Sequence, residues 1–410
     1  METHSGNDED PLKPGRAARK PRGANGRGLR VALLYNVKEN APSLNGSAPP
    51  DIFDELDSLE DVRAYTTALR AGGHTVYPME GDPDLLRELR RRPVDICFNT
   101  CEGIRGDSRE AQVPALLEMM GLPYTAATVM GMAISLDKAM TKRVLVFHGL
   151  PTPRFQEFNR AAQPLDPTLR FPLFTKPNRE GTAIGISNKS IVRDEAALRE
   201  RLAYLLDAYR ETVLVEEYVD GRDVTCGLVG NLTDPNLPTP PEGIPSASGH
   251  PGGSADWNGV HIFPLSEVDH SAYEPGRAPV YSHRLKIDLA YDYHFMCPTE
   301  VPEAIGNKIR RLTVETFRAT GCRDMCRVDF RLDTRSGNAL QPQILEINGL
   351  PGITPISDLT ECAKADGWTY ERLINGVLDA AIDRYGLEKL LARRRETMQK
   401  SSAALESLSN

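Results

Sequence analysis

Two apolar segments near the C-terminal end of the chain constrain its fold more than any other feature. They are CRVDFRL (326–332) and QILEINGL (343–350), and the polar, glycine-containing stretch DTRSGNA (333–339) separates them. Short runs rich in β-branched and aromatic residues on either side of a turn-forming stretch are typical of two paired strands. The two segments are therefore predicted to form a β-hairpin.

Oxygen-bearing side chains interrupt these otherwise apolar strands. Because side chains alternate along a strand, Arg327, Asp329 and Arg331 share one face of the first strand, and Glu346 and Asn348 share one face of the second. If the register brings them together, their oxygens suit Mg²⁺ beside nucleotide phosphates. The alternative is an internal ion pair with one of the arginines, because buried acids are usually paired. The residues alone leave both open.

A strand followed by a glycine loop lies earlier in the chain. FPLFTKPNREGTAIGIS (171–187) carries Lys176 on the predicted strand, with Gly181 and Gly185 in the loop. Glycines let backbone N–H groups approach phosphates closely. No Lys-Ser/Thr follows the glycines, so this is not a Walker A motif. The loop is either a phosphate-binding loop or an ordinary turn.

A third segment ends in acidic residues. VLVEEYVDGRD (213–223) places Glu216 and Glu217 at the end of an apolar strand, with Asp223 after the turn. These carboxylates could accept hydrogen bonds from adenine and ribose, or they could be the solvated end of a strand.

The rest of the chain predicts an α/β protein with α+β character in its C-terminal half. RVALLYN (30–36) is expected to be a buried first strand, and Ser58 to cap the following helix together with Asp61. The predicted units are a disordered tail (1–28), a doubly wound α/β domain (29–133), a central domain (134–215), a C-terminal domain (216–386) with a long loop (231–259), and a terminal helix and tail (387–410).

Charge and composition limit the possible partners to small molecules. The formal net charge is -8, and no long basic stretch follows the first thirty residues, which argues against nucleic acid or an anionic membrane as a partner. No apolar run predicts a membrane span or a secretory signal. The seven cysteines are scattered without CxxC pairs and predict buried thiols of a cytoplasmic protein rather than zinc or disulfide sites.

Five separated motifs, taken in order, resemble the series of the ATP-grasp ligases, and the D-alanine:D-alanine ligase family is the most similar. The motifs are DKAMTKRVL, FTKPNREGTAIGIS, VLVEEYVDGRD, CRVDF and LEINGLPGITPIS, within residues 135–385. The resemblance implies an ATP-grasp fold and a ligase that joins a carboxylate to an amine through an acyl phosphate. It also implies ATP, two Mg²⁺ ions with Mn²⁺ as a substitute, and a homodimer.

The resemblance implies roles for individual residues. Those implied to bind ATP are Lys138, Lys176, Gly181, Glu216, Glu217, Val219, Asp223 and Lys286. Asp223 stands where the family usually has Glu. The implied metal ligands are Asp329, Glu346 and Asn348. Arg327 and the Gly352 N–H would stabilise the oxyanion, Thr182 would keep the hydroxyl of the lid serine, and Ser357 would bind the second substrate's carboxylate.

The residues expected to face the substrates depart from the family pattern. The glycine-rich first loop and its acidic, serine-containing signature are absent, so Glu55 or Asp57 is expected to hold the first substrate's ammonium, with helix-start charge as the alternative. Ile287 replaces a tyrosine, and Asp358 replaces an apolar residue beside the second substrate. His283 is either a substrate contact or a surface histidine.

The loop after VDICFN also differs from the histidine-containing loop of the family. Its charged residues Glu102, Arg105 and Arg109 either bind a carboxylate or a phosphate, or lie on an exposed loop without a ligand.

The leading functional hypothesis is an amino-acid ligase that forms a dipeptide or an amide, because the ATP and metal residues persist while the substrate residues change. Authentic D-alanine:D-alanine ligation for the cell wall is the alternative. A nucleotide-binding regulatory protein without turnover is a third hypothesis, against which the complete set of Arg327, Asp329, Glu346 and Asn348 argues.

Overall fold

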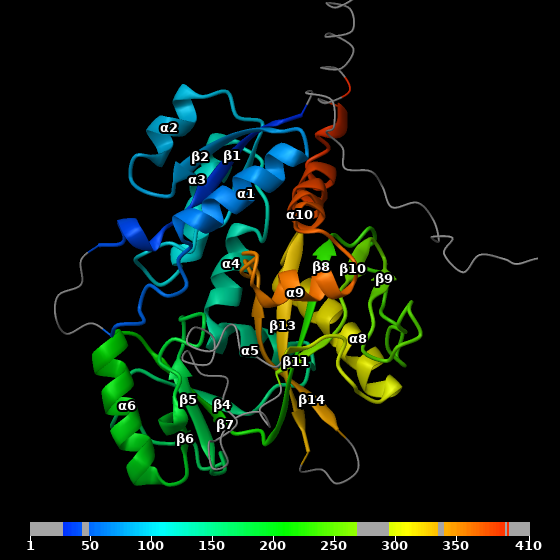
Figure 1. Ribbon diagram of the computed structural model, residues 1–410. Coiled ribbons are helices and arrows are strands. Elements are labelled where there is room, and N and C mark those ends of the chain that lie inside the picture. Colours follow the sequence, from blue (N-terminus) through cyan, green and yellow to red (C-terminus); the bar gives the residue numbers. More distant parts are fainter. Residues whose placement is uncertain (1–27, 43–48, 269–294, 335–339, 390–391, 393–410) are drawn as a thin grey trace, which may run out of the picture.

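The N-terminal part of the structure is a three-stranded parallel sheet. The residues that the computed structural model describes are 28–42, 49–268, 295–334, 340–389 and 392 (Figure 1). The strand order is β2-β1-β3, with β1 (Arg30–Tyr35), β2 (Thr75–Glu80) and β3 (Ile96–Asn99). The central strand β1 is buried along most of its length, as expected for a parallel strand covered on both faces.

Helices cover both faces of this sheet. Val31 and Leu33 of β1 belong to the core under α1 (Leu59–Ala71), and the alternate residues Ala32 and Leu34 belong to the core under α2 and α3. The helices and turns of this part are η1 (Lys38–Asn40), α2 (Leu85–Arg91), η2 (Arg109–Ala111) and α3 (Gln112–Met120). The predicted doubly wound arrangement is therefore confirmed.

Helix α1 begins at the predicted residue. The Ser58 hydroxyl accepts a hydrogen bond from the Asp61 N–H at 3.2 Å, and the Asp61 carboxylate accepts one from the Ser58 N–H at 2.9 Å. This reciprocal capping box satisfies two N–H groups that the first helical turn leaves without partners. Gly72 is the C-cap residue.

A small antiparallel sheet in the order β4-β7-β5-β6 lies at the lower left of the molecule in Figure 1, and α6 covers it. Its elements are β4 (Phe155–Phe158), β5 (Leu173–Pro177), η3 (Asn188–Ser190), β6 (Ile191–Val192), α6 (Glu195–Tyr209) and β7 (Val213–Glu217). Apolar residues of α6 pack with β5 and β7 in a separate core. Helices α4 (Val129–Leu136) and α5 (Lys138–Phe147) precede this sheet.

The large C-terminal sheet is built around one long strand, β8 (Gly221–Gly230), which pairs with β10, β11 and β13. Its other strands are β9 (Ala255–Trp257), β10 (Val260–Ile262), β11 (Ser266–Val268), β12 (Phe295–Met296), β13 (Met325–Asp333) and β14 (Gln341–Asn348). The helices are α8 (Glu303–Thr320), α9 (Asp358–Ala365) and α10 (Tyr370–Arg384). The predicted hairpin is the antiparallel pair of β13 and β14.

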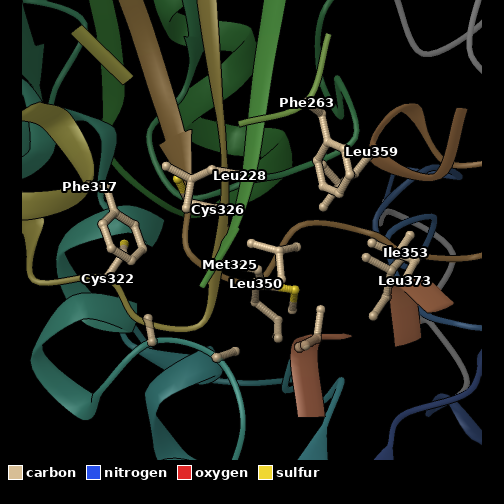
Figure 2. Close-up of a cluster of buried hydrophobic side chains, with 14 of the residues drawn as sticks. Leu228, Phe263, Phe317, Cys322, Met325, Cys326, Leu350, Ile353, Leu359 and Leu373 are labelled. Atoms are coloured by element: carbon tan, nitrogen blue, oxygen red, sulfur yellow. The ribbon is translucent and has the colours of Figure 1, made fainter. Parts of the chain in front are cut away.

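One continuous core joins the N-terminal and large sheets. Figure 2 shows part of it, where Cys322 and Cys326 lie among side chains from β8, α8 and α9. All seven cysteines are free thiols, and all but Cys297 are buried. Among the described residues, none of the helices has the length and apolar character needed to span a bilayer.

Two predicted boundaries differ from the structure. Strand β7 runs to Glu217, two residues past the boundary placed at residue 215, because the acidic pair continues the strand. The segment predicted as a long loop (231–259) contains strand β9 at Ala255–Trp257. Strand β9 is stabilised by its antiparallel pairing with β10. The other domain limits remain predictions.

His261 on β10 predicts a pH-dependent contribution to stability. Its Nδ1 lies 2.7 Å from Asp256 and its Nε2 lies 2.8 Å from Asp366. Burial opposes protonation, but the two carboxylates outweigh it and raise the pKa of His261 above its usual value. A raised pKa gives stability that is complete below the unfolded-state pKa of about 6.5 and is lost as the pH rises through the folded-state pKa.

We therefore expect His261→Gln to destabilise the protein more at pH 5.5 than at pH 9. Thermal unfolding of both proteins across this range measures the difference. A melting-temperature gap that stays constant with pH would show that His261 contributes through packing alone.

Candidate active site

Two adjoining pockets lie where the sheets meet. The inter-sheet pocket lies between β5 and β7 of the small sheet and β8, β13 and β14 of the large sheet. The acidic pocket lies between the segment 54–61, residues of the 100–110 segment and the turn 349–358. Lys138, Arg327 and Asp358 line both pockets. Molecules bound in the two pockets can therefore meet beside these three side chains.

A buried row of alternating charges crosses the inter-sheet pocket. Lys142 lies 2.7 Å from Glu216 Oε2, and Lys176 lies 3.3 Å from Glu216 Oε1. Lys176 also lies 3.4 Å from Glu346 Oε2, which in turn is 3.9 Å from Lys138. Lys142, Lys176 and Glu216 are almost completely buried. Charges this far from water are held only when each has a partner.

This row keeps its carboxylate and its central lysine ionised. Burial favours the neutral form of Glu216, but Lys142 and Lys176 outweigh it and lower the pKa of Glu216. Burial likewise opposes the charge of Lys176, but Glu216 and Glu346 outweigh it and raise its pKa. Lys176 is therefore a fixed positive charge at the wall of the pocket.

The hairpin register brings the predicted oxygen cluster together. Asp329 is paired with Glu346, and Arg327 with Asn348, with an irregularity after Asp329. Arg327 donates to both carboxylate oxygens of Asp329 at 3.0 and 2.9 Å, and Asn348 Nδ2 lies 3.3 Å from Asp329. The predicted oxygen cluster and the predicted ion pair thus occur at the same place.

The donor set fits a hard divalent cation. Two carboxylates and one amide oxygen are the ligand types that Mg²⁺ takes beside phosphate oxygens. Among the described residues, no group of three or more His, Cys, Asp or Glu side chains is arranged to hold a metal, so further ligands would come from the bound nucleotide or water.

The acids predicted to contact adenine and ribose have protein partners. Glu216 lines the inter-sheet pocket and is held by two lysines, and its contact with adenine remains a prediction. Glu217 accepts a hydrogen bond from the Arg170 N–H at 3.0 Å. Asp223 lies 2.5 Å from Arg331, which also donates to the Val219 carbonyl at 3.0 Å. Glu217, Val219, Asp223 and Arg331 line the inter-sheet pocket as well.

The glycine loop contacts the N-terminal domain. The Gly181 N–H donates to Glu55 at 3.1 Å, and the Gly185 N–H donates to Asp51 at 3.0 Å. These two amides thus hold the loop to the N-terminal domain, and a role of the loop toward phosphate remains a prediction. Lys138 donates to the Glu180 carbonyl at 2.6 Å and so holds the start of the loop.

The residues expected to bind substrates line the acidic pocket. They are Glu55, Thr182, Gly352, Ser357 and Asp358. The Ser357 hydroxyl is engaged in its own turn, where it accepts from the Thr354 N–H at 3.0 Å. Glu55 pairs with Arg109 at 2.5 Å, so it is not a free partner for a substrate ammonium. Asp358 lies 3.9 Å from Arg327.

The alternative acid, Asp57, also lines this pocket. It accepts hydrogen bonds from the hydroxyls of Tyr65 at 3.0 Å and Thr100 at 2.9 Å. Burial raises its pKa to about 7, and these hydrogen bonds oppose the shift. His283, Lys286 and Ile287 lie outside the described residues.

The charged residues of the loop after β3 lie in two different environments. Glu102 lines the acidic pocket, whereas Arg105 and Arg109 line a different hollow beside Arg179 and Glu211. Arg109 bridges Glu55 at 2.5 Å and Glu180 at 3.2 Å, and so joins the N-terminal domain to the glycine loop. Arg109 is thus buried in an ion pair rather than exposed or available to an anion.

Sequence reasoning missed two residues of this region. Lys142 lies within the motif DKAMTKRVL, from which no role for it was predicted, although the spacing of Lys138 and Lys142 places both on one face of α5. Glu110 lies in the acidic pocket, and no pattern in the sequence pointed to it.

The chain is similar in sequence to known proteins. The family model described as the D-ala D-ala ligase C-terminus matches residues 144–244 and 264–379. A D-alanine–D-alanine ligase of Cupriavidus metallidurans is 33% identical, with 79% of this chain and 87% of the relative covered. The corresponding ligase of Xanthomonas axonopodis pv. citri is 31% identical, over 86% and 99%. An uncharacterized protein of Sinorhizobium fredii, y4sG, is 34% identical, over 78% and 87%.

A solved structure has a similar fold. The crystal structure of the Bacillus anthracis D-alanine–D-alanine ligase complexed with ATP superposes with a TM-score of 0.61 at 19% identity, covering 88% of this chain and all of that one.

Proposed function

Because the chain belongs to the D-alanine–D-alanine ligase family, we propose that it is an ATP-dependent ligase that joins an amino-acid carboxylate to an amine. ATP occupies the inter-sheet pocket, and the two substrates occupy the acidic pocket. The observation that supports this proposal best is that Lys138 and Arg327 line both the inter-sheet pocket and the acidic pocket beside it.

Phosphoryl transfer is assigned to the inter-sheet pocket. Lys138 and Lys176 neutralise the phosphates of ATP while the carboxylate of the first substrate attacks the γ-phosphorus, which gives an acyl phosphate and ADP. The buried Glu216 and the half-buried Glu346 keep Lys176 charged for this role. Asp329, Glu346 and Asn348 would hold Mg²⁺, which supplies charge neutralisation at the phosphate oxygens.

Acyl transfer is assigned to the border of the two pockets. The amine attacks the acyl carbon, the C–O bond to phosphate breaks, and phosphate leaves as the amine nitrogen loses a proton. Arg327 and the Gly352 N–H would stabilise the tetrahedral oxyanion, and a donor of this kind is worth about 3 kcal/mol. The glycine loop, held to the N-terminal domain through Glu55 and Asp51, would exclude water from the acyl phosphate.

The identity of the substrates decides between two ligase functions. The names of the relatives favour D-alanine as both substrates. The carboxylate of Asp358 and the changed residues of the acidic pocket favour a different pair. The homodimer and the cytoplasmic location implied by the resemblance remain predictions.

Phosphate release from MgATP, measured with single and paired amino acids and with the product identified by mass, tests the proposal. D-Alanine alone yielding its dipeptide would assign the cell-wall reaction. Turnover with another pair would assign a different amide-forming ligase. Binding of ATP without phosphate release in the presence of any amino acid would contradict the ligase proposal and favour a regulatory protein.

A further inference from the structure

The acidic pocket carries an excess of negative charge. Its described lining contains seven carboxylates and three cationic side chains. The acids are Asp54, Glu55, Asp57, Asp61, Glu102, Glu110 and Asp358, and the cations are Lys38, Lys138 and Arg327. Two amino acids that each carry no net charge do not require a pocket with such an excess of carboxylates.

The three cations of the lining already have acidic or carbonyl partners. Lys38 lies 3.5 Å from Asp54, Lys138 is held by the Glu180 carbonyl at 2.6 Å, and Arg327 is paired with Asp329 at 2.9 Å. None of them is within ion-pair distance of Asp57, Glu102 or Glu110, three acids at the N-terminal wall of the pocket.

Two acids of that wall have no hydrogen bond or ion pair with any described residue. Glu110 is half-buried at the pocket wall, and burial together with the charge of Glu55 raises its pKa to about 7, although Arg109 opposes the shift. Burial and the charges of Glu110 and Glu55 raise the pKa of Glu102 well above its usual range. Asp57 beside them has only hydroxyl partners.

Protein structures rarely keep such acids without compensation. A half-buried carboxylate without an ionic partner is only partly solvated, and a cation placed beside it recovers part of that cost. The α-ammonium of one amino acid satisfies only part of a group of three acids. A substrate with a second ammonium supplies the missing charge, whereas an uncharged side chain of the same length would leave the acids unpaired.

This inference rests on the proposed function and specifies its substrate. We propose that one of the two substrates is a diamino acid, whose side-chain ammonium lies against Glu102 and Glu110 in the acidic pocket. The reacting carboxylate and the attacking amine then lie toward Lys138 and Arg327, at the border with the inter-sheet pocket.

Matched substrates test this inference. Phosphate release from MgATP is measured with alanine paired with lysine, ornithine or 2,4-diaminobutyrate, each in both configurations, and with alanine paired with the uncharged isosteres norleucine, norvaline and 2-aminobutyrate. We expect kcat/KM for at least one diamino acid to exceed that of its isostere by more than about tenfold. Equal values for charged and uncharged partners would overturn the inference while leaving the ligase proposal intact.

Variants test which carboxylates recognise the side-chain ammonium of the substrate. The double substitution Glu102→Gln, Glu110→Gln keeps the shape of both side chains and should reduce the preference for the diamino acid by about tenfold or more. Glu242→Gln removes one exposed carboxylate outside the pocket and should leave the preference unchanged. Retention of the full preference in the double variant would overturn the assignment to these two acids.

A binding measurement separates this inference from the ligase proposal. Calorimetric titration of the complex with a non-hydrolysable ATP analogue compares lysine and ornithine with norleucine and norvaline. Tighter binding of the diamino acids, without phosphate release from ATP, would support the cation site and contradict ligase activity. Equal binding would overturn the cation site whatever the turnover.

Discussion

Replacing Glu346 with glutamine should lower phosphate release from MgATP by about a thousandfold while the protein still folds. The Glu346 carboxylate lies opposite Asp329 in the hairpin and 3.4 Å from Lys176. The substitution removes the negative charge of a carboxylate proposed to bind Mg²⁺. That interaction is worth several kcal/mol in the transition state, and a loss of about 4 kcal/mol corresponds to a thousandfold lower rate. Steady-state phosphate release over a range of Mg²⁺ concentrations measures the loss.

A matched control separates this effect from a general change of charge. Glu157→Gln makes the same substitution on β4 of the small sheet, where Glu157 pairs with the exposed Arg143. The control should keep near-normal turnover, and circular dichroism should show the same fold in both variants. A Glu346→Gln variant with near-normal turnover at low Mg²⁺ would exclude Glu346 as a metal ligand. Asp329→Asn should behave as Glu346→Gln does.

Replacing Lys142 with methionine should destabilise the protein by about 3 to 5 kcal/mol and also weaken ATP binding. Lys142 is completely buried between Glu216 at 2.7 Å and the Thr152 hydroxyl at 2.7 Å. Removing one member of a buried charge pair leaves the other uncompensated, and this loss has the stated magnitude. Glu216 would then be held by Lys176 alone and would draw that lysine away from the nucleotide.

Two measurements distinguish structural support from positioning. Denaturant unfolding gives the stability change, and steady-state kinetics give KM for ATP separately from kcat. We expect KM for ATP to rise, and Lys142→Arg to recover part of both losses because it restores the charge. Arg143→Met, on the exposed side of α5, breaks only a surface ion pair and should cost less than about 1 kcal/mol. An unchanged KM in a folded Lys142→Met protein would limit Lys142 to a structural role.

Local patterns in the sequence were sufficient for the secondary structure around the site. The Ser58 and Asp61 cap, the parallel N-terminal sheet and the pairing of β13 with β14 all follow from interactions between residues close in sequence or from strand alternation. Such patterns report which face a side chain occupies. They do not report which distant side chain lies opposite that face.

Contacts between distant elements could not be predicted. Lys142 of α5 and Lys176 of β5 hold Glu216 inside the protein. Glu55 and Asp51 of the N-terminal domain accept hydrogen bonds from two amides of the glycine loop. In each case the partner is tens of residues or more away in the chain, so spacing carried no information about it.

The sequence by itself determined the family, the motif order and the faces on which the charged residues lie, because these depend on local periodicity and on residue type. Only the tertiary structure decided which charges compensate one another. It paired Lys142 and Lys176 with Glu216 and left Glu102 and Glu110 without an ionic partner among the described residues. The energy of a buried charge depends on everything within a few ångströms of it, and that environment exists only after the three sheets have packed.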